Sequence, residues 1–251
     1  MALDFPGSGG VGITYTATAT QDGLTSFTIS LWYQRTAGGG EFGYGRPFTK
    51  DPYWQILNDN GDAGNGMVFE ADFSTTNGIW SVAYPSNGVW VHDLITYNGT
   101  ATTNDPVWYR NGSSITVTER TTPSGSIATD TSELYVGWSS DGTEWDGAVA
   151  ECAYWNRIVT AAEIEALTEG YSASFINNGL KFYAPVIRNN NDIVGGAAAT
   201  TSGSPTNFAH PKIIYPSKKW LIDNTAAAGG GDVFPEWPQF QSRGFWTPKY
   251  S

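Results

Sequence analysis

The chain has 251 residues, with 24 acidic and 13 basic side chains and a formal net charge of −11. Contacts to phosphate need clustered Lys and Arg, so this balance argues against nucleic acid as a partner. Hydrophobic residues make up 40% and charged residues only 15%, against a usual charged share of roughly 25%. A surface that is poor in charge and rich in Thr, Ser, Asn and Gly favours a β-rich globular protein.

Period-two alternation of apolar and polar side chains recurs over the first 187 residues and predicts a series of strands. Over residues 27–33 it places Phe27, Ile29, Leu31 and Tyr33 on one side. Further strands are expected at 67–73, 90–97, 106–110, 115–119, 133–138 and 179–187. Asn111-Gly112 joins two of these runs and is a strong signal for a hairpin. Many short strands with tight turns predict an antiparallel sandwich.

The strand that begins at Asp146-Gly147 contains the only cysteine of the chain. Regular alternation would place Ala148, Ala150, Cys152 and Tyr154 on one face. A single cysteine excludes an internal disulfide, and its apolar neighbours predict a buried, inert thiol.

One short helix is expected after this strand. Thr160 can accept from the backbone as N-cap, and Glu163, three residues on, completes a capping box. Ile164 and Leu167 give the helix an apolar stripe, and Gly170 is placed to end it.

These motifs together resemble the concanavalin A-like or LamG-like jelly roll. The matching residues are Trp90, His92, Thr96 and Tyr97; Tyr109, Asn111 and Gly112; and Trp145, Asp146, Gly147, Trp155, Asn156, Arg157, Thr160, Glu163 and Ile164. The chain departs from the family at Ala150-Glu151-Cys152, where the family often has an acidic pair. The resemblance covers roughly residues 2–187 and implies an all-β, two-sheet antiparallel sandwich with one short helix. It says little about function, because the fold serves lectins, glycosidases, adhesion modules and virion proteins.

A change in composition predicts three segments. We expect the jelly-roll domain over 1–190, a flexible linker of Gly, Ala, Thr and Ser over 191–207, and an extended aromatic, Pro-rich arm over 208–251. The arm has no regular period, yet it is too aromatic for an ordinary disordered tail. It packs along its own body or inserts its aromatic side chains into a neighbouring subunit, with simple disorder as the third alternative. The residues expected to bind a partner are Ile213, Ile214, Tyr215, Trp220, Phe234, Trp237, Phe240, Phe245, Trp246 and Tyr250.

Carboxylates at alternate positions of one strand form the catalytic set of glucanases with this fold. Glu70 and Asp72 have that spacing, but the third position is Ser74, so the set is incomplete. The sequence therefore predicts no catalytic residues, and a glycoside hydrolase is the least favoured alternative.

Two short segments carry oxygen ligands of the kind that Ca²⁺ prefers: Asp59, Asn60 and Asp62, and Asp141 with Glu144. Calcium sites need six or more oxygens, so turn chemistry is the favoured explanation and no metal or cofactor is expected, with Ca²⁺ as the alternative. His92 and His210 are the only histidines, which argues against zinc. His92 is expected to be a strand histidine with a hydrogen-bond partner.

Eleven tryptophans are enough to leave some available for stacking against a sugar. The candidates in or beside loops are Trp54, Trp80, Trp108 and Trp138. Most such residues fill the core of a sandwich, so each is a candidate and no more.

The favoured function is a non-enzymatic structural virion protein. The absence of a signal-peptide pattern, the incomplete catalytic set and the aromatic arm favour a phage capsid decoration or accessory subunit, made in the host cytoplasm without a signal peptide. We expect it to lie on the outer surface of the particle, to form a homo-oligomer, and to dock through its arm on other subunits such as the major capsid protein. No stretch is apolar enough to span a membrane. The alternative is a carbohydrate-binding, lectin-like module, which a virion could also display.

Overall fold

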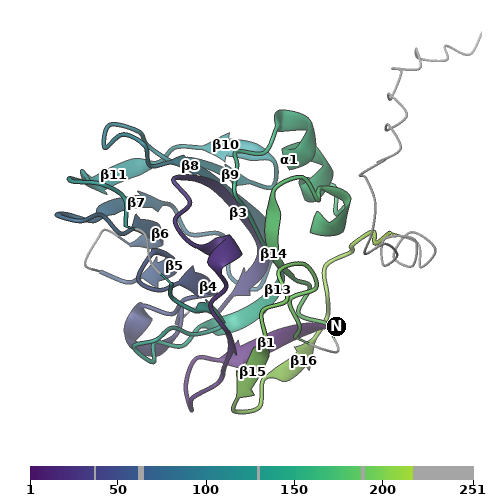
Figure 1. Cartoon of the computed structure of the whole chain (residues 1–251). Helices are drawn as coiled ribbons and strands as arrows, with labels where there is room; N and C mark the ends of the chain where they lie inside the picture. The colour runs from purple at the N-terminus through teal and green to yellow at the C-terminus, as the bar shows by residue number, and fades with distance from the viewer. Residues whose placement is uncertain (37, 62–64, 129–130, 188–189, 217–251) are drawn as a thin grey trace, which may run out of the picture. The chain divides into compact units, whose positions relative to one another are not determined.

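Two antiparallel sheets form the body of the protein in the computed structural model (Figure 1). The structure describes residues 1–216 except 37, 62–64, 129–130 and 188–189. The first sheet has, in order, β10 (Ser113–Ile115), β9 (Val107–Arg110), β8 (Trp90–Asn98), β3 (Ser26–Arg35), β13 (Asp146–Trp155), β1 (Ala2–Pro6) and β16 (Thr206–Phe208), with β14 (Leu180–Ala184) also paired to β13. The second has β11 (Thr118–Thr121), β7 (Gly78–Val82), β6 (Gly66–Ala71), β5 (Trp54–Asp59), β4 (Phe48–Lys50), β12 (Leu134–Val136), β2 (Gly12–Tyr15) and β15 (Ala199–Ser202). The expected two-sheet sandwich is confirmed.

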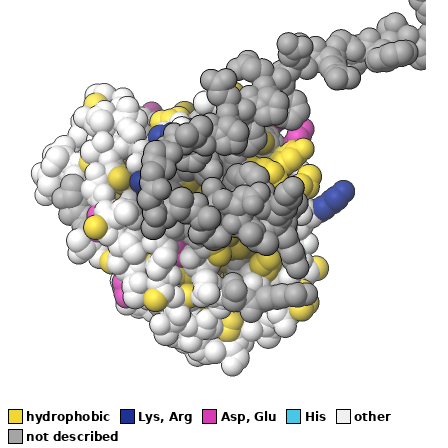
Figure 2. All heavy atoms as spheres, turned by 45° about the vertical axis from the view of Figure 1, so that its right-hand side comes forward, with side chains coloured by type: hydrophobic (Ala, Val, Ile, Leu, Met, Phe, Trp, Pro, Cys, Tyr) yellow, Lys and Arg dark blue, Asp and Glu magenta, His cyan; other side chains and the backbone are white. Residues whose placement is uncertain are grey.

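Four short helical segments connect the strands within the described residues. They are the α-helix α1 (Ala161–Thr168) and the 3₁₀ turns η1 (Ala19–Gln21), η2 (Glu41–Gly43) and η3 (Ala173–Phe175). None of the helices in the described ranges is long and apolar enough to cross a membrane. Among the described residues in view in Figure 2, few side chains are charged, as the composition predicts.

Aromatic side chains fill the space between the sheets. The ring of Phe27 lies 5.7 to 6.4 Å, centroid to centroid, from those of Tyr53, Phe69, Tyr97 and Tyr154. Tilted and edge-on pairs at these distances stabilise a core beyond the area they bury, by about 0.5–1.5 kcal/mol each. The inward-facing side chains of the strands are therefore used in core packing. A functional site is expected among the outward-facing side chains.

A bulge in β13 changes which residues face this core. Glu151 has φ +57°, and the pairing of β13 with β3 shifts register around it. Cys152 and Tyr154 lie in the core between the sheets, whereas Ala148 and Ala150 do not. The prediction of one shared face for these four residues is wrong, because the bulge reverses the alternation.

The helix α1 lies where the capping signals place it, on the outer face of the first sheet (Figure 1). Thr160 and Glu163 form the expected capping box. Ile164 and Leu167 pack against β8, β13 and β14 in a cluster separate from the core between the sheets. Gly170 follows the helix with φ +91° and donates its backbone N–H to Leu167 O at 3.1 Å.

Residues 199–202 and 206–208 form strands rather than a flexible linker. β15 pairs with β2 over Ala199–Ser202, and β16 pairs with β1 over Thr206–Phe208. Small and β-branched side chains suit an edge strand as well as a linker, so composition alone misassigned this segment. The folded body therefore extends beyond residue 190, where the composition predicts the end of the jelly-roll domain.

The first part of the predicted arm is attached to the body. Ile214 donates its N–H to Gly170 O at 2.7 Å and accepts from Ser172 N at 3.0 Å. Tyr215 Oη donates to Glu151 Oε1 at 2.6 Å. Contacts divide the chain into the units 1–216 and 217–251. For Ile214 and Tyr215 these contacts within the chain support the alternative in which the arm packs along its own body.

The remaining partner-binding candidates fall into two groups. Ile213 belongs to the attached segment and is partly buried. Trp220, Phe234, Trp237, Phe240, Phe245, Trp246 and Tyr250 lie outside the described residues.

Candidate functional site

Three of the four tryptophan candidates lie in the core. Trp54, Trp80 and Trp108 have no exposed surface. They occupy inward positions of their strands, where large aromatic side chains contribute most to packing. The prediction that these three stack against a sugar is therefore wrong. Trp138 is different, because it is only half-buried.

The indole of Trp138 lies against β2. A Cβ atom added at Gly12 would come within 2.2 Å of Trp138 Cγ, so only glycine at this position leaves room for the ring. Trp138 Nε1 is buried and has no hydrogen-bond partner among the described residues. Because the N–H edge faces inward, the exposed part of the side chain is ring carbon.

Tyr135 lies beside this indole on the outer face of the second sheet. Its neighbours Leu134 and Val136 belong to the core, so strand alternation directs Tyr135 outward. The ring centroids of Tyr135 and Trp138 are 6.4 Å apart, at 73°. The two rings together form an aromatic corner at this end of β12.

Arg46 organises the polar groups around this corner. Its Nε donates to Gln55 Oε1 at 2.5 Å. Its Nη1 donates to Ser139 Oγ and Asp141 Oδ1, both at 2.9 Å. Thr143 also donates to Asp141 Oδ1, through its N–H at 3.0 Å and its hydroxyl at 2.7 Å. These bonds hold the side chains in one arrangement before any ligand arrives.

A second group of bonds extends this network toward Tyr135. Gln55 Nε2 donates to Asp51 Oδ1 at 3.1 Å, and Ser140 Oγ donates to Asp51 Oδ2. Tyr135 Oη donates to Glu133 Oε2 at 3.0 Å. We call Trp138, Tyr135, Arg46, Gln55, Asp51, Ser139, Ser140 and Asp141 the outer-face cluster.

The ionisation states of the outer-face cluster follow from its contacts. Burial alone would raise the pKa of Asp141, but hydrogen bonds from Ser139, Thr143 and Arg46 outweigh it and hold this pKa well below its usual value. Burial and the bond to Glu133 raise the pKa of Tyr135 to about 12. At neutral pH the cluster therefore offers a fixed carboxylate, a guanidinium and a phenol that keeps its proton.

The cluster suits the binding of a neutral, hydroxyl-rich molecule. The exposed ring carbon of Trp138 offers an apolar surface, and the surrounding carboxylates, amide and hydroxyls offer donors and acceptors around it. The sequence patterns did not point to Arg46, Asp51, Ser139, Ser140, Gln55 or Tyr135. For the last two the available signal was alternation, since each stands between inward-facing residues of a strand.

The carboxylates considered for catalysis or calcium are used in local contacts. Glu70 accepts from Asn77 Nδ2 at 2.9 Å. Glu144 accepts from the backbone N–H groups of Gly10 and Val11 at 2.7 and 3.1 Å. Within the described ranges, no three His, Cys, Asp or Glu side chains come together in a group that could hold a metal ion. Asp62, the third member of one predicted calcium segment, lies outside those ranges.

His92 is a buried strand histidine with hydrogen-bond partners, as expected. Its Nε2 lies 2.8 Å from Ser30 Oγ, and its Nδ1 lies 3.3 Å from Thr168 Oγ1. Burial lowers the pKa of His92 to about 4. The imidazole is therefore neutral in the folded protein over most of the physiological range.

This depressed pKa predicts a loss of stability in mild acid. An unfolded histidine titrates near pH 6.5, so between pH 6.5 and 4 the unfolded chain binds a proton that the folded chain does not. We expect the free energy of unfolding to fall by about 2 kcal/mol from pH 7 to pH 5 on account of His92 alone. Urea unfolding at both pH values checks this. A His92→Gln variant should lose this part of the slope, and an unchanged slope would contradict the assignment.

Known proteins match the chain in family and fold. Residues 7–165 match the family model described as the Concanavalin A-like lectin/glucanases superfamily. No curated protein sequence matches the chain. The structure is similar to a heptameric SAP-like pentraxin from Limulus polyphemus, at 15% identity and a TM-score of 0.56, over 82% of this chain and 93% of that one. It is also similar to a proposed carbohydrate-binding protein from Bacteroides ovatus ATCC 8483, at 17% identity and a TM-score of 0.55, over 82% of this chain and 61% of that one.

At these identities the structural likeness shows the fold. The family match is a separate observation, since it rests on sequence and extends from the first turn of the body to the capped helix α1. It spans more than half of the chain, and the protein therefore belongs to the Laminin_G_3 family of the concanavalin A-like lectin/glucanases superfamily.

Proposed function

We propose that this protein is a non-catalytic carbohydrate-binding module and that its ligand stacks against Trp138. The half-buried indole of Trp138, seated on Gly12 within the outer-face cluster, carries the proposal. The family description includes lectins, and one similar structure bears a title that names carbohydrate binding. Both favour this function over the virion function that the sequence features favour.

The geometry supports a sugar ligand for two reasons. A pyranose presents an apolar C–H face, which gains by covering exposed ring carbon, and hydroxyls at its rim, which need fixed partners. Arg46, Gln55 and Asp51 already bond to one another, so the cluster loses little side-chain entropy on binding. The catalytic carboxylate set is incomplete at Ser74, which supports binding without hydrolysis.

Replacing the indole tests the site. Trp138→Ala should weaken retention on an immobilised glycan at least about tenfold, because it removes an aromatic contact of roughly 1.5 kcal/mol or more. Trp90→Ala is the matched control, since Trp90 is also half-buried but packs against Phe208 on the first sheet. Affinity electrophoresis through gels that contain polysaccharide measures both. Equal retardation of the two variants would contradict this placement of the site.

A second candidate function is that of a virion accessory subunit. The aromatic, Pro-rich composition of residues 217–251 supports it, and in this proposal the segment binds other subunits such as the major capsid protein at the outer surface of a particle. The two functions are compatible, because the outer-face cluster belongs to the unit 1–216. A chain that ends at Pro216 and still decorates particles at full occupancy would contradict this second function.

A further inference from the structure

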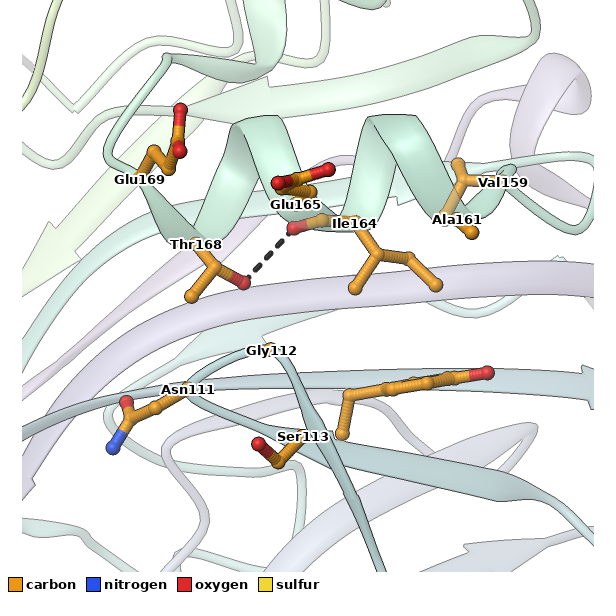
Figure 3. Close-up of a pocket in the computed structure, with 10 residues that line it drawn as sticks. Asn111, Gly112, Ser113, Val159, Ala161, Ile164, Glu165, Thr168 and Glu169 are labelled. Atoms are coloured by element: carbon orange, nitrogen blue, oxygen red, sulfur yellow. Dashed lines mark hydrogen bonds between the residues drawn. The ribbon is translucent and has the colours of Figure 1, made fainter. Parts of the chain in front are cut away.

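A pocket separates α1 from the β9–β10 hairpin, on the outer face of the first sheet (Figure 3). Its volume is about 510 Å³, which falls within the range of small-molecule sites. The lining residues are Tyr109, Asn111, Gly112, Ser113, Val159, Ala161, Ile164, Glu165, Thr168 and Glu169. None of them belongs to the outer-face cluster, so this pocket is a separate site.

The inner part of the pocket is apolar. Val159 and Ile164 are buried members of the cluster beneath α1, and Tyr109 packs against that cluster. Figure 3 shows Ile164 and Thr168 pointing from the helix toward the hairpin. A Cβ atom at Gly112 would lie 3.1 Å from Thr168 Cγ2, so the hairpin passes close to the helix at this end. An alkyl chain would find aliphatic and aromatic contacts here.

Both formal charges that line the pocket are negative. Glu165 and Glu169 are exposed, stand one turn apart and lie at the C-terminal end of α1, where the last turn has no basic residue. Like charges at this spacing destabilise a helix, and carboxylates are also unfavourable near its C-terminus. Among the described residues neither glutamate has an ion-pair partner.

The nearby cationic groups do not neutralise these glutamates. Arg157 pairs with Glu163 at 2.6 Å, and Arg110 pairs with Asp93 at 2.8 Å. The imidazole of His92, which contacts Thr168 beneath the pocket, is neutral above about pH 4. In the part of the chain that the structure describes, no cationic side chain, Lys212 beside Gly170 included, forms an ion pair with either glutamate, so the lining has a formal charge of −2.

We propose that this pocket binds an alkylammonium group. The alkyl chain lies along Ile164 and the ring of Tyr109, and the ammonium group lies near Glu165 and Glu169. A cation at this position relieves the repulsion between the two carboxylates and gains from the π face of the tyrosine. The group belongs either to a free amine or to a lysine side chain of a peptide, since both have the same chemistry.

Isothermal titration of the full-length chain tests the proposal with two matched pairs of probes. The first pair is n-pentylamine and its neutral analogue 1-pentanol. The second is Nα-acetyl-lysine N-methylamide and the same compound acetylated at Nε. We expect the cationic member of at least one pair to bind, its neutral partner not to bind, and the affinity to fall when NaCl is raised from 50 to 500 mM. Tighter binding of pentylamine indicates a free amine, and tighter binding of the lysine compound indicates a peptide.

Two variants distinguish the contribution of the carboxylates to binding from the contribution of the cavity. The double variant Glu165→Gln/Glu169→Gln should bind about tenfold more weakly, because two partly exposed charge contacts together amount to about that factor. Ser113→Trp should fill the pocket and abolish binding. Glu119→Gln is the control, since it removes an exposed carboxylate from β11 of the other sheet. Binding of neither cation, equal binding of the neutral analogues, or unchanged affinity in the double variant would each overturn the proposal.

Discussion

Replacing Arg110 by methionine is expected to lower the free energy of unfolding by about 3–5 kcal/mol, because it leaves a buried carboxylate without its counter-charge. Asp93 has no exposed side-chain surface. Arg110 donates to both of its oxygens, from Nε at 2.9 Å and from Nη2 at 2.8 Å. Tyr33 Oη also donates to Asp93, at 2.8 Å. This network ties β3, β8 and β9 together at one end of the first sheet.

Urea unfolding at pH 7 measures the effect, and two further variants define it. Arg120→Met removes an exposed arginine with a bond to Ser81, and it should change the free energy of unfolding by less than about 1 kcal/mol. The double variant Arg110→Met/Asp93→Leu should recover part of the loss, because it removes both charges. A loss below 1 kcal/mol for Arg110→Met alone would show that Asp93 is not buried as described.

The second large effect concerns where the folded body ends. A chain of residues 1–216 should unfold at the same temperature as the full chain, since it retains the whole first unit. A chain of residues 1–198 loses β15, β16 and the segment that binds Gly170 and Glu151. We expect its melting temperature to fall by at least about 10 °C, because each lost hydrogen bond contributes about 1 kcal/mol and 1 kcal/mol corresponds to roughly 2–4 °C at this size.

Scanning calorimetry of the three chains makes this comparison. The truncation at residue 198 exposes the edges of β2 and β1, which β15 and β16 otherwise pair. Equal melting temperatures for chains 1–198 and 1–216 would contradict the structure. That result would instead support the flexible linker that the composition of residues 191–207 predicts.

The strands and the helix could be predicted because their signals are local. Apolar side chains at alternate positions of residues 27–33 predict a strand with one inward face, and β3 occupies Ser26–Arg35. Asn111-Gly112 adopts positive φ at both residues, +49° and +79°, as a two-residue hairpin requires. The capping box of α1 involves groups only three residues apart, so sequence spacing decides it.

The errors arose where a local signal is ambiguous. Alternation assumes a regular strand, and nothing in the sequence around Glu151 marks the bulge that reverses it. A tryptophan beside a loop can face the core or the solvent. Trp54, Trp80 and Trp108 face the core, because burial removes a large apolar area from water.

The candidate site could not be assembled from the sequence for a different reason. Arg46 and Asp141 are 95 residues apart and meet only because β4 and β12 are neighbours in the second sheet. The position of Gly12 under the indole of Trp138 depends likewise on the pairing of β2 with β12. Such contacts depend on which strands are neighbours in the sheet, and the spacing of residues along the sequence does not reveal this.

Retention of the protein on a panel of immobilised neutral glycans tests the central claim most directly. The full-length chain and the Trp138→Ala variant are applied side by side, with folding of both checked by near-UV circular dichroism. The proposed function predicts that the full-length chain is retained by at least one glycan and that the variant elutes with the unbound fraction. No retention of the full-length chain on any glycan, or equal retention of the folded variant, would contradict the claim that the outer-face cluster binds carbohydrate.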